Sequence, residues 1–246
     1  MLHKRSLVPS LFTMLNLFFG FFAIVNALQE KFVTAAWLII IAAVWDGIDG
    51  KIARKANASS EFGVEFDSLA DVVSFGVSPA VLIYQVYFYK LGAPGVILSF
   101  LPLLFGSIRL ARFNVNLEAS EKENFSGLPI PSMAVTISAY VIFNYDLWEG
   151  LRFAPVFASL VVLLSILMVS NVEYETIPKL TFRGGRKNSL ALTVLVLALG
   201  CIVVFREKAM FPLVLGFVLL GVFRSILNHV REEDEDEEVF DISLPD

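Results

Sequence analysis

Continuous apolar stretches, each about as long as a membrane-spanning helix, follow one another along the chain and are separated by short polar segments. A helix needs about 20 mostly apolar residues to cross a membrane, and only helices and closed barrels satisfy the backbone in lipid. Because the stretches are continuous rather than alternating, they predict helices. Eight spans are expected, at Leu7–Leu28, Val33–Arg54, Phe62–Tyr89, Gly92–Ile108, Ile130–Tyr145, Phe153–Val172, Leu190–Phe205 and Met210–Leu227.

The composition agrees with an all-α integral membrane protein of one domain. Of the 246 residues, 57% are hydrophobic and 17% are charged, whereas about 25% are charged in an average soluble domain. The single cysteine, Cys201, excludes an intramolecular disulfide. An acidic run follows the last span, so residues 1–230 are expected to form the transmembrane domain and residues 231–246 a disordered acidic tail.

Basic residues are distributed unevenly between the two sides of the membrane that eight spans would define. With the first residues in the cytoplasm, 14 of the 19 Lys and Arg residues lie on that side and 5 lie on the other. The cytoplasmic loops of membrane proteins carry an excess of Lys and Arg. The distribution therefore favours an even number of spans, with both termini in the cytoplasm.

Four aspartates interrupt the apolar pattern around the junction of the second and third spans. Asp46 and Asp49 are three residues apart and Asp67 and Asp71 are four apart, so each pair shares one helix face. A turn between the spans would bring the two pairs together, where their charges would repel. Protonation would reduce this repulsion. Bound divalent cations are the better explanation for how the four charges are tolerated, because carboxylate oxygens suit Mg²⁺, Mn²⁺ or Ca²⁺. Two ions sharing such ligands are typical of phosphoryl chemistry.

The residues around these aspartates form a long motif. Eight residues over 26 positions fit D-x-x-D-G-x-x-A-R followed by G-x-x-x-D-x-x-x-D, namely Asp46, Asp49, Gly50, Ala53, Arg54, Gly63, Asp67 and Asp71. In this motif the chain resembles the CDP-alcohol phosphatidyltransferase family. The resemblance implies a bundle of membrane helices whose site opens to the cytoplasm and to the lipid.

Other segments narrow the resemblance to the phosphatidylserine synthase branch of that family. They are SLADVVSFGVSPA at 68–80, RLARFN at 109–114 and FSGLPIPSMA at 125–134. Val72 follows the last aspartate, where the branch that uses glycerol phosphate usually has Lys. Ser10 stands where the first helix of the family usually has Asn, which is a departure from the pattern.

The resemblance implies an enzyme that transfers a phosphatidyl group from CDP-diacylglycerol to L-serine and releases CMP. Two ions, Mg²⁺ or Mn²⁺, would bind Asp46, Asp49 and Asp67, with Asp71 close to one ion and acting as the general base. It also implies membrane lipids as partners, a homodimer and a location in the cytoplasmic (inner) membrane, with the site facing the cytoplasm. No nucleic acid partner is expected.

Further residues are candidates for substrate binding. Thr13 and Asn16 on the first span would either touch the cytidine or bond a neighbouring helix. Arg54 would either bind phosphate through its guanidinium or anchor the helix end at the cytoplasm. Arg109 and Arg112 would hold the serine carboxylate, with lipid headgroups as the alternative ligand. The full set expected around the CDP-lipid is Thr13, Asn16, Gly50, Ala53, Arg54, Ser60 and Gly63.

Other interpretations stay open. Another acceptor alcohol, such as glycerol phosphate or an inositol compound, would use the same chemistry. Intramembrane carboxylates also mark ion paths in transporters, although this chain has no matching acidic pair in a second half, as a transporter repeat would require. A structural scaffold would leave the four aspartates unexplained, because close helix packing accounts only for Gly50 and Gly63.

Overall fold

The computed structural model describes residues 4–56, 61–118, 127–172 and 207–242, together with 174, 193, 200, 201 and 205. Within the helices, the side chains of residues 4–10, 53–56, 61, 116–118 and 228–242 are outside this description. The described part is helical and contains no strand, which confirms the predicted all-α fold class. Its elements are α1 Lys4–Leu28, α2 Phe32–Ala56, α3 Glu61–Asp71, η1 Val72–Val77, α4 Ser78–Val86, η2 Phe88–Leu91, α5 Ala93–Glu118, α6 Ile130–Trp148, α7 Ala154–Val169 and α9 Glu207–Ile242.

Several of the predicted spans correspond to helices long and apolar enough to cross a membrane. Five described stretches qualify, and α7 is a shorter apolar helix. The predicted span Leu190–Phe205 falls almost entirely outside the described residues, so the total of eight stays a prediction. The qualifying stretches are Leu11–Leu28, Phe32–Ile52, Phe62–Val86, Ala93–Val115 and Glu207–Leu227.

Two boundaries differ most from the apolar pattern. The fourth span was expected to end at Ile108, but α5 continues to Glu118, because an α-helix does not end where hydrophobicity ends. At the other end of the chain, α9 continues to Ile242 and so includes most of the acidic run. The domain boundary at 230 and the disorder of the tail remain predictions.

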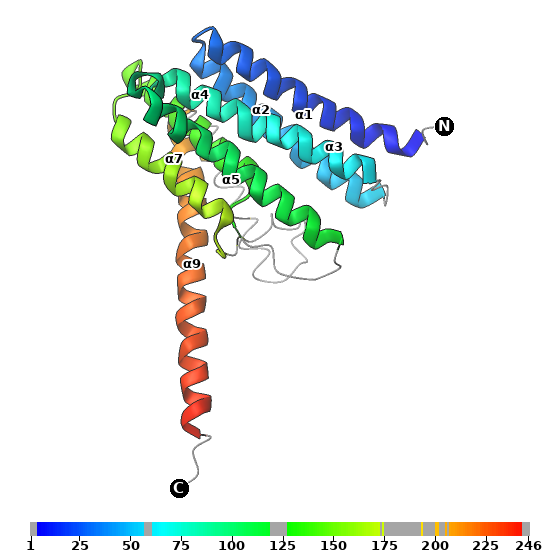
Figure 1. The fold of residues 1–246 in the computed structure, drawn as a ribbon, viewed down its shortest axis with the longest axis vertical. Coiled ribbons are helices and arrows are strands. Elements are labelled where there is room, and N and C mark those ends of the chain that lie inside the picture. Colours follow the sequence, from blue (N-terminus) through cyan, green and yellow to red (C-terminus); the bar gives the residue numbers. More distant parts are fainter. Residues whose placement is uncertain are drawn as a thin grey trace.

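The helices form a bundle in which α1 and α2 lie side by side, with the run α3–η1–α4 packed along α1 (Figure 1). Helix α5 packs against α4 and α7, and α6 packs against α2 and α9. Phe75, Phe88 and Phe157 are fully buried in the hydrophobic core of the bundle. Helix α9 extends away from the other helices over much of its length (Figure 1).

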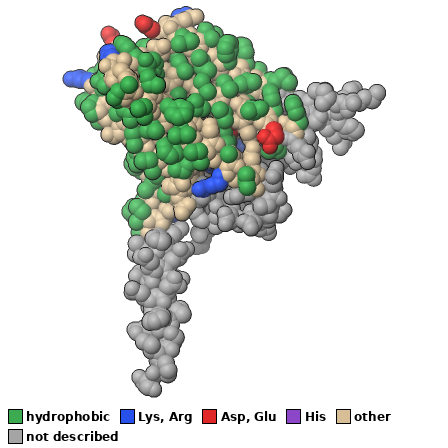
Figure 2. Space-filling model, in the orientation of Figure 1, with side chains coloured by type: hydrophobic (Ala, Val, Ile, Leu, Met, Phe, Trp, Pro, Cys, Tyr) green, Lys and Arg blue, Asp and Glu red, His purple; other side chains and the backbone are tan. Residues whose placement is uncertain are grey.

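Much of the outside of the bundle is apolar. Large side chains such as Phe18, Phe21, Ile97 and Phe223 are exposed, and Figure 2 shows a face covered mostly by hydrophobic side chains, with charged groups near its edges. A soluble monomer rarely exposes such extensive apolar surface. These helices therefore belong to an integral membrane protein.

One contact between α1 and the following helical run is unusually close. Gly20 of α1 lies against Ser74, and an added Cβ at Gly20 would overlap the Ser74 side chain and backbone. The Ser78 hydroxyl donates a hydrogen bond to the Gly20 carbonyl, with an O···O distance of 2.6 Å. Ser74 lies in η1, a six-residue π-helical segment that begins directly after Asp71. Such segments are frequent at functional sites.

Replacing Gly20 by Ala is expected to push α1 away from η1. Overpacking a tight contact costs about 1–3 kcal/mol, so the midpoint of thermal unfolding in detergent should fall. Gly216→Ala in α9 is the matched control, because an added Cβ at Gly216 meets no atom within 4 Å among the described residues. Equal unfolding midpoints for the two variants would contradict the close contact.

Candidate metal and substrate site

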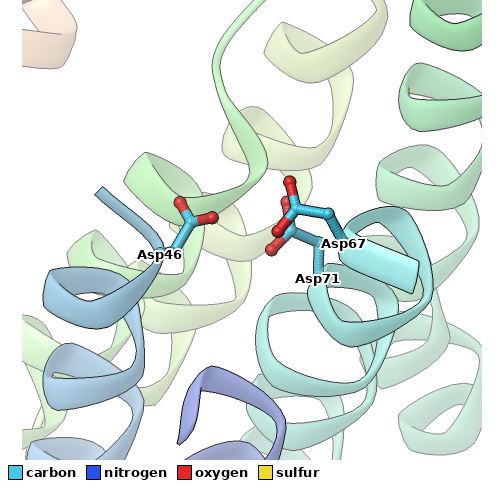
Figure 3. A group of neighbouring side chains, drawn as sticks. All are labelled: Asp46, Asp67 and Asp71. Atoms are coloured by element: carbon cyan, nitrogen blue, oxygen red, sulfur yellow. The ribbon is translucent and has the colours of Figure 1, made fainter. Parts of the chain in front are cut away.

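Three of the four aspartates converge between α2 and α3. Asp46 reaches from α2 toward Asp67 and Asp71, which project together from α3 (Figure 3). One carboxylate oxygen from each of the three lies within 4.8 Å of the others. Asp71 is buried, with 8% of its surface exposed, whereas Asp46 and Asp67 are half-buried. The helical spacing and the antiparallel pairing of the two spans thus produce the predicted acidic cluster.

Asp49 lies beside this cluster. Its Oδ2 accepts a hydrogen bond from the Thr13 hydroxyl of α1. Its other oxygen is buried and has no hydrogen-bond partner in the described part of the chain. Asp49 is close enough to interact electrostatically with Asp46 and Asp67. The four predicted ligands therefore share one region, with three in a compact group and the fourth next to it.

The donor set fits a hard divalent cation. Every group in the cluster offers oxygen, which Mg²⁺, Mn²⁺ and Ca²⁺ prefer and which does not suit Zn²⁺ or copper. Besides the free oxygen of Asp49, Asp67 has a buried oxygen without a hydrogen-bond partner among the described residues. Buried polar atoms are normally paired. Unpaired oxygens beside a group of like charges are the arrangement that a bound cation would complete.

Helix α1 supplies hydrogen-bond donors to both aspartate-bearing helices. Thr13 is bonded to Asp49 on α2, and the Asn16 side chain donates to Asp71 on α3 at 3.1 Å. Both side chains are almost fully buried. Two roles were expected for Thr13 and Asn16, and the structure shows one of them, because both side chains form hydrogen bonds to a neighbouring helix. Contact with the cytidine stays a prediction.

Helix α5 lies on the other side of the cluster. Arg109 is half-buried and interacts electrostatically with Asp71 and Arg112, and its Nε has no hydrogen-bond partner in the described ranges. Arg112 is exposed. The structure brings Arg109 to the aspartates, but it does not test whether either arginine holds serine.

A polar pair that the motif did not predict connects α3 to α5. The Asn114 amide donates a hydrogen bond to the Ser68 hydroxyl at 3.0 Å. Ser68 directly follows Asp67, and Asn114 belongs to the RLARFN segment. The presence of a polar residue within each of two apolar helices could have indicated that both side chains need hydrogen-bond partners. No spacing rule could have shown that Ser68 and Asn114 bond each other.

The remaining predicted contacts to the CDP-lipid are only partly described. Gly50 lies on α2 and Gly63 on α3, within the same helices as the aspartates. The backbones of Ala53 and Arg54 belong to α2, but their side chains are outside the description. Ser60 is outside the described residues. The roles of these residues stay predictions.

Comparison with known proteins identifies related sequences over most of the chain. The sequence model of the CDP-alcohol phosphatidyltransferase family matches residues 6–170. A CDP-diacylglycerol–serine O-phosphatidyltransferase of Helicobacter pylori (strain ATCC 700392 / 26695) is 39% identical over 228 residues, covering 92% of this chain and 93% of the relative. An archaetidylserine synthase of Methanothermobacter thermautotrophicus is 36% identical over 177 residues, covering 69% and 70%.

A shorter relative matches nearly its whole length. The CDP-diacylglycerol–serine O-phosphatidyltransferase of Bacillus subtilis (strain 168) is 33% identical over 173 residues, covering 70% of this chain and 92% of the relative. The residues matched by the family model, 6–170, include the aspartate-bearing helices α2 and α3.

Divalent cations are expected to stabilise the purified protein through the acidic cluster. A ligand at about 100 times its Kd stabilises a protein by about 2.7 kcal/mol, so Mn²⁺ should raise the midpoint of thermal unfolding. Asp67→Asn should remove most of this rise. Without cations, Asp67→Asn should be at least as stable as the wild type, because it removes one of the repelling charges.

Asp146→Asn is the control for this measurement. Asp146 pairs with Lys208 at 3.9 Å on other helices, so this variant should keep the Mn²⁺-dependent rise. Equal effects of Mn²⁺ on the Asp67→Asn and Asp146→Asn variants would contradict a cation site at the cluster.

Proposed function

Because this chain belongs to the CDP-alcohol phosphatidyltransferase family, we propose that it transfers the phosphatidyl group of CDP-diacylglycerol to the hydroxyl of L-serine, giving phosphatidylserine and CMP. The main support for this proposal is the convergence of Asp46, Asp67 and Asp71 in a chain that is 39% identical to a CDP-diacylglycerol–serine O-phosphatidyltransferase. Val72, in place of the Lys that is usual in the glycerol phosphate branch, favours serine over that acceptor.

The acidic cluster would hold two divalent ions, Mg²⁺ or Mn²⁺. Asp46, Asp49 and Asp67 are the proposed ligands, and Asp71 adjoins one ion. When bound, such ions neutralise charge on a pyrophosphate and on the leaving phosphate. The buried unpaired oxygens of Asp49 and Asp67 support this assignment.

Asp71 is the proposed general base. It would accept the proton of the serine hydroxyl while the hydroxyl oxygen attacks the β-phosphorus of CDP-diacylglycerol. The bond between that phosphorus and the bridging oxygen breaks, and CMP leaves with the bonding electrons. A serine hydroxyl is a poor nucleophile without a positioned base. Asp71 is suited to this role because it is buried and belongs to the converging group.

Arg109 and Arg112 are the proposed ligands of the serine carboxylate. Arg109 has the stronger support, because it interacts with Asp71 and has a buried Nε without a hydrogen-bond partner in the described chain. A guanidinium beside the base would place the carboxylate of serine near its reacting hydroxyl. Gly50, Ala53, Arg54, Ser60 and Gly63 are proposed to contact the CDP-lipid.

The location and assembly of the enzyme are also part of the proposal. We place the site and both termini on the cytoplasmic side of the inner membrane, on the basis of the distribution of Lys and Arg. The proposed assembly is a homodimer surrounded by membrane lipids. In this arrangement the acidic tail extends into the cytoplasm.

With CDP-diacylglycerol and Mn²⁺ or Mg²⁺, the purified protein is expected to release CMP when L-serine is added, but not with glycerol 3-phosphate or inositol phosphate. Asp71→Asn should lower this rate at least about 100-fold, since general bases contribute about 10²–10⁴-fold. Asp146→Asn serves as the control. Release with another alcohol would reassign the acceptor, and ion flux in sealed vesicles without any CMP release would favour a transporter.

Replacing Arg109 by Ala is expected to raise the KM for serine while the KM for CDP-diacylglycerol changes little. A hydrogen bond to a charged group contributes about 1.5–3 kcal/mol, so the rise should be about 10-fold to 100-fold. Arg152→Ala is the control, because Arg152 stacks on Trp148 at the end of α6. An unchanged KM for serine in both Arg109→Ala and Arg112→Ala would contradict the assignment.

A further inference from the structure

Asn16 makes two hydrogen bonds to the segment that begins at Asp71, while its own Oδ1 is buried without a partner among the described residues. Its side-chain amide donates to Asp71 Oδ1 at 3.1 Å, and its backbone carbonyl accepts a hydrogen bond from the Ser74 hydroxyl at 3.0 Å. Asn16 and Ser74 are both 0% exposed. Because Ser74 follows Asp71 by three residues, side chain and backbone of Asn16 are tied to one short segment of the neighbouring helix.

The same pattern repeats one turn further along both helices. Gly20 is four residues after Asn16 and Ser78 is four after Ser74, and the Ser78 hydroxyl donates to the Gly20 carbonyl at 2.6 Å. Gly20 has no room for a Cβ against Ser74. Two carbonyls of α1 that are one helical turn apart, those of Asn16 and Gly20, therefore accept hydrogen bonds from Ser74 and Ser78. These bonds fix the backbone that carries the Asn16 side chain relative to Asp71.

The π-helical segment helps to produce this alignment. It starts at Val72, directly after Asp71, and Ser78 also bonds the Val73 carbonyl at 3.0 Å. A π-helical turn contains more residues than an α-helical turn, so the register changes between Asp71 and the serines. Asp71 can thus meet both the acidic cluster and the Asn16 amide, while the Ser74 hydroxyl reaches the Asn16 carbonyl.

We propose that Asn16 is a positioning residue for Asp71. By occupying Oδ1, it sets the orientation of the carboxylate and leaves the other oxygen to accept the proton of the attacking hydroxyl. Ser74 acts one step further away, by fixing the backbone of Asn16. This assignment rests on the proposed function, in which Asp71 is the general base, and it differs from a role of Asn16 in contacting the cytidine.

The two roles predict different kinetics for Asn16→Ala at saturating Mn²⁺. A positioning role lowers kcat by about 10-fold to 100-fold, because small displacements of a reacting group have effects of that order. The KM values for CDP-diacylglycerol and serine then change by less than about 3-fold. Ser74→Ala, which keeps the Asn16 side chain, should lower kcat by a smaller factor with the same KM values.

Asn26→Ala is the matched control. Asn26 is also a buried asparagine of α1, with 5% of its surface exposed, but its amide bonds the Phe22 carbonyl of its own helix at 2.8 Å. Its replacement removes a buried hydrogen bond without changing the surroundings of Asp71. The control should lower the midpoint of thermal unfolding while kcat stays within about 3-fold of the wild type.

A second readout does not depend on activity. Loosening Asp71 should raise the Mn²⁺ concentration that gives half of the thermal stabilisation, by about 3-fold or more, as loss of a residue that orients a ligand does. The rise is expected in Asn16→Ala and Ser74→Ala but not in Asn26→Ala. If Asn16→Ala does not fold, Ser74→Ala decides the question by both readouts.

Three results would overturn the proposal. A raised KM for CDP-diacylglycerol with unchanged kcat would assign Asn16 to the substrate. Equal loss of kcat in Asn16→Ala and Asn26→Ala would make Asn16 merely structural, and an unchanged Mn²⁺ dependence would show that Asp71 is not held by Asn16. Serine-dependent CMP release by the wild type is measured first, so failure of the proposed function is recognised separately.

Discussion

Carboxylates between membrane-spanning helices lose their hydration and repel one another, and this constraint determines the arrangement around Asp46, Asp67 and Asp71. Only part of the compensation comes from the chain itself. Hydrogen bonds from Thr13 and Asn16 each satisfy one oxygen, and Arg109 lies near Asp71. Because Arg109 is the basic group that the described residues bring to Asp71, the cluster is proposed to bind cations, and cations held by carboxylates would in turn bind a pyrophosphate.

The need to hold these charges explains why α1 packs so closely on the aspartate-bearing helices. In lipid, helices associate through small residues and hydrogen bonds rather than through the hydrophobic effect. Gly20 allows the close approach, and Ser74 and Ser78 bond the carbonyls of α1. The same contacts that stabilise the bundle therefore orient the side chains of the site. The contacts that hold α1 against η1 and the proposed catalytic site thus share one interface.

The sequence predicted the elements that follow from periodicity and local spacing. The apolar stretches indicated the helices, and the intervals of three and four residues indicated that the pairs Asp46/Asp49 and Asp67/Asp71 would meet. Asp46, Asp67 and Asp71 form a compact group, whereas Asp49 lies beside it. It could not predict the partners of Thr13 and Asn16 or the pair Ser68–Asn114, because these depend on how helices distant in the chain pack. The π-helical segment was also not predicted from the sequence, because the residues of this segment carry no distinguishing local pattern.

The aspartates are proposed to hold two divalent ions close together. Electron paramagnetic resonance of the protein titrated with Mn²⁺ tests this proposal directly, because ions about 3.5–4 Å apart share ligands and couple magnetically. We expect two bound ions per chain with a spin-coupled signal, and we expect both to be lost in Asp46→Asn. A single uncoupled ion, or binding that persists in Asp46→Asn, would contradict the proposal.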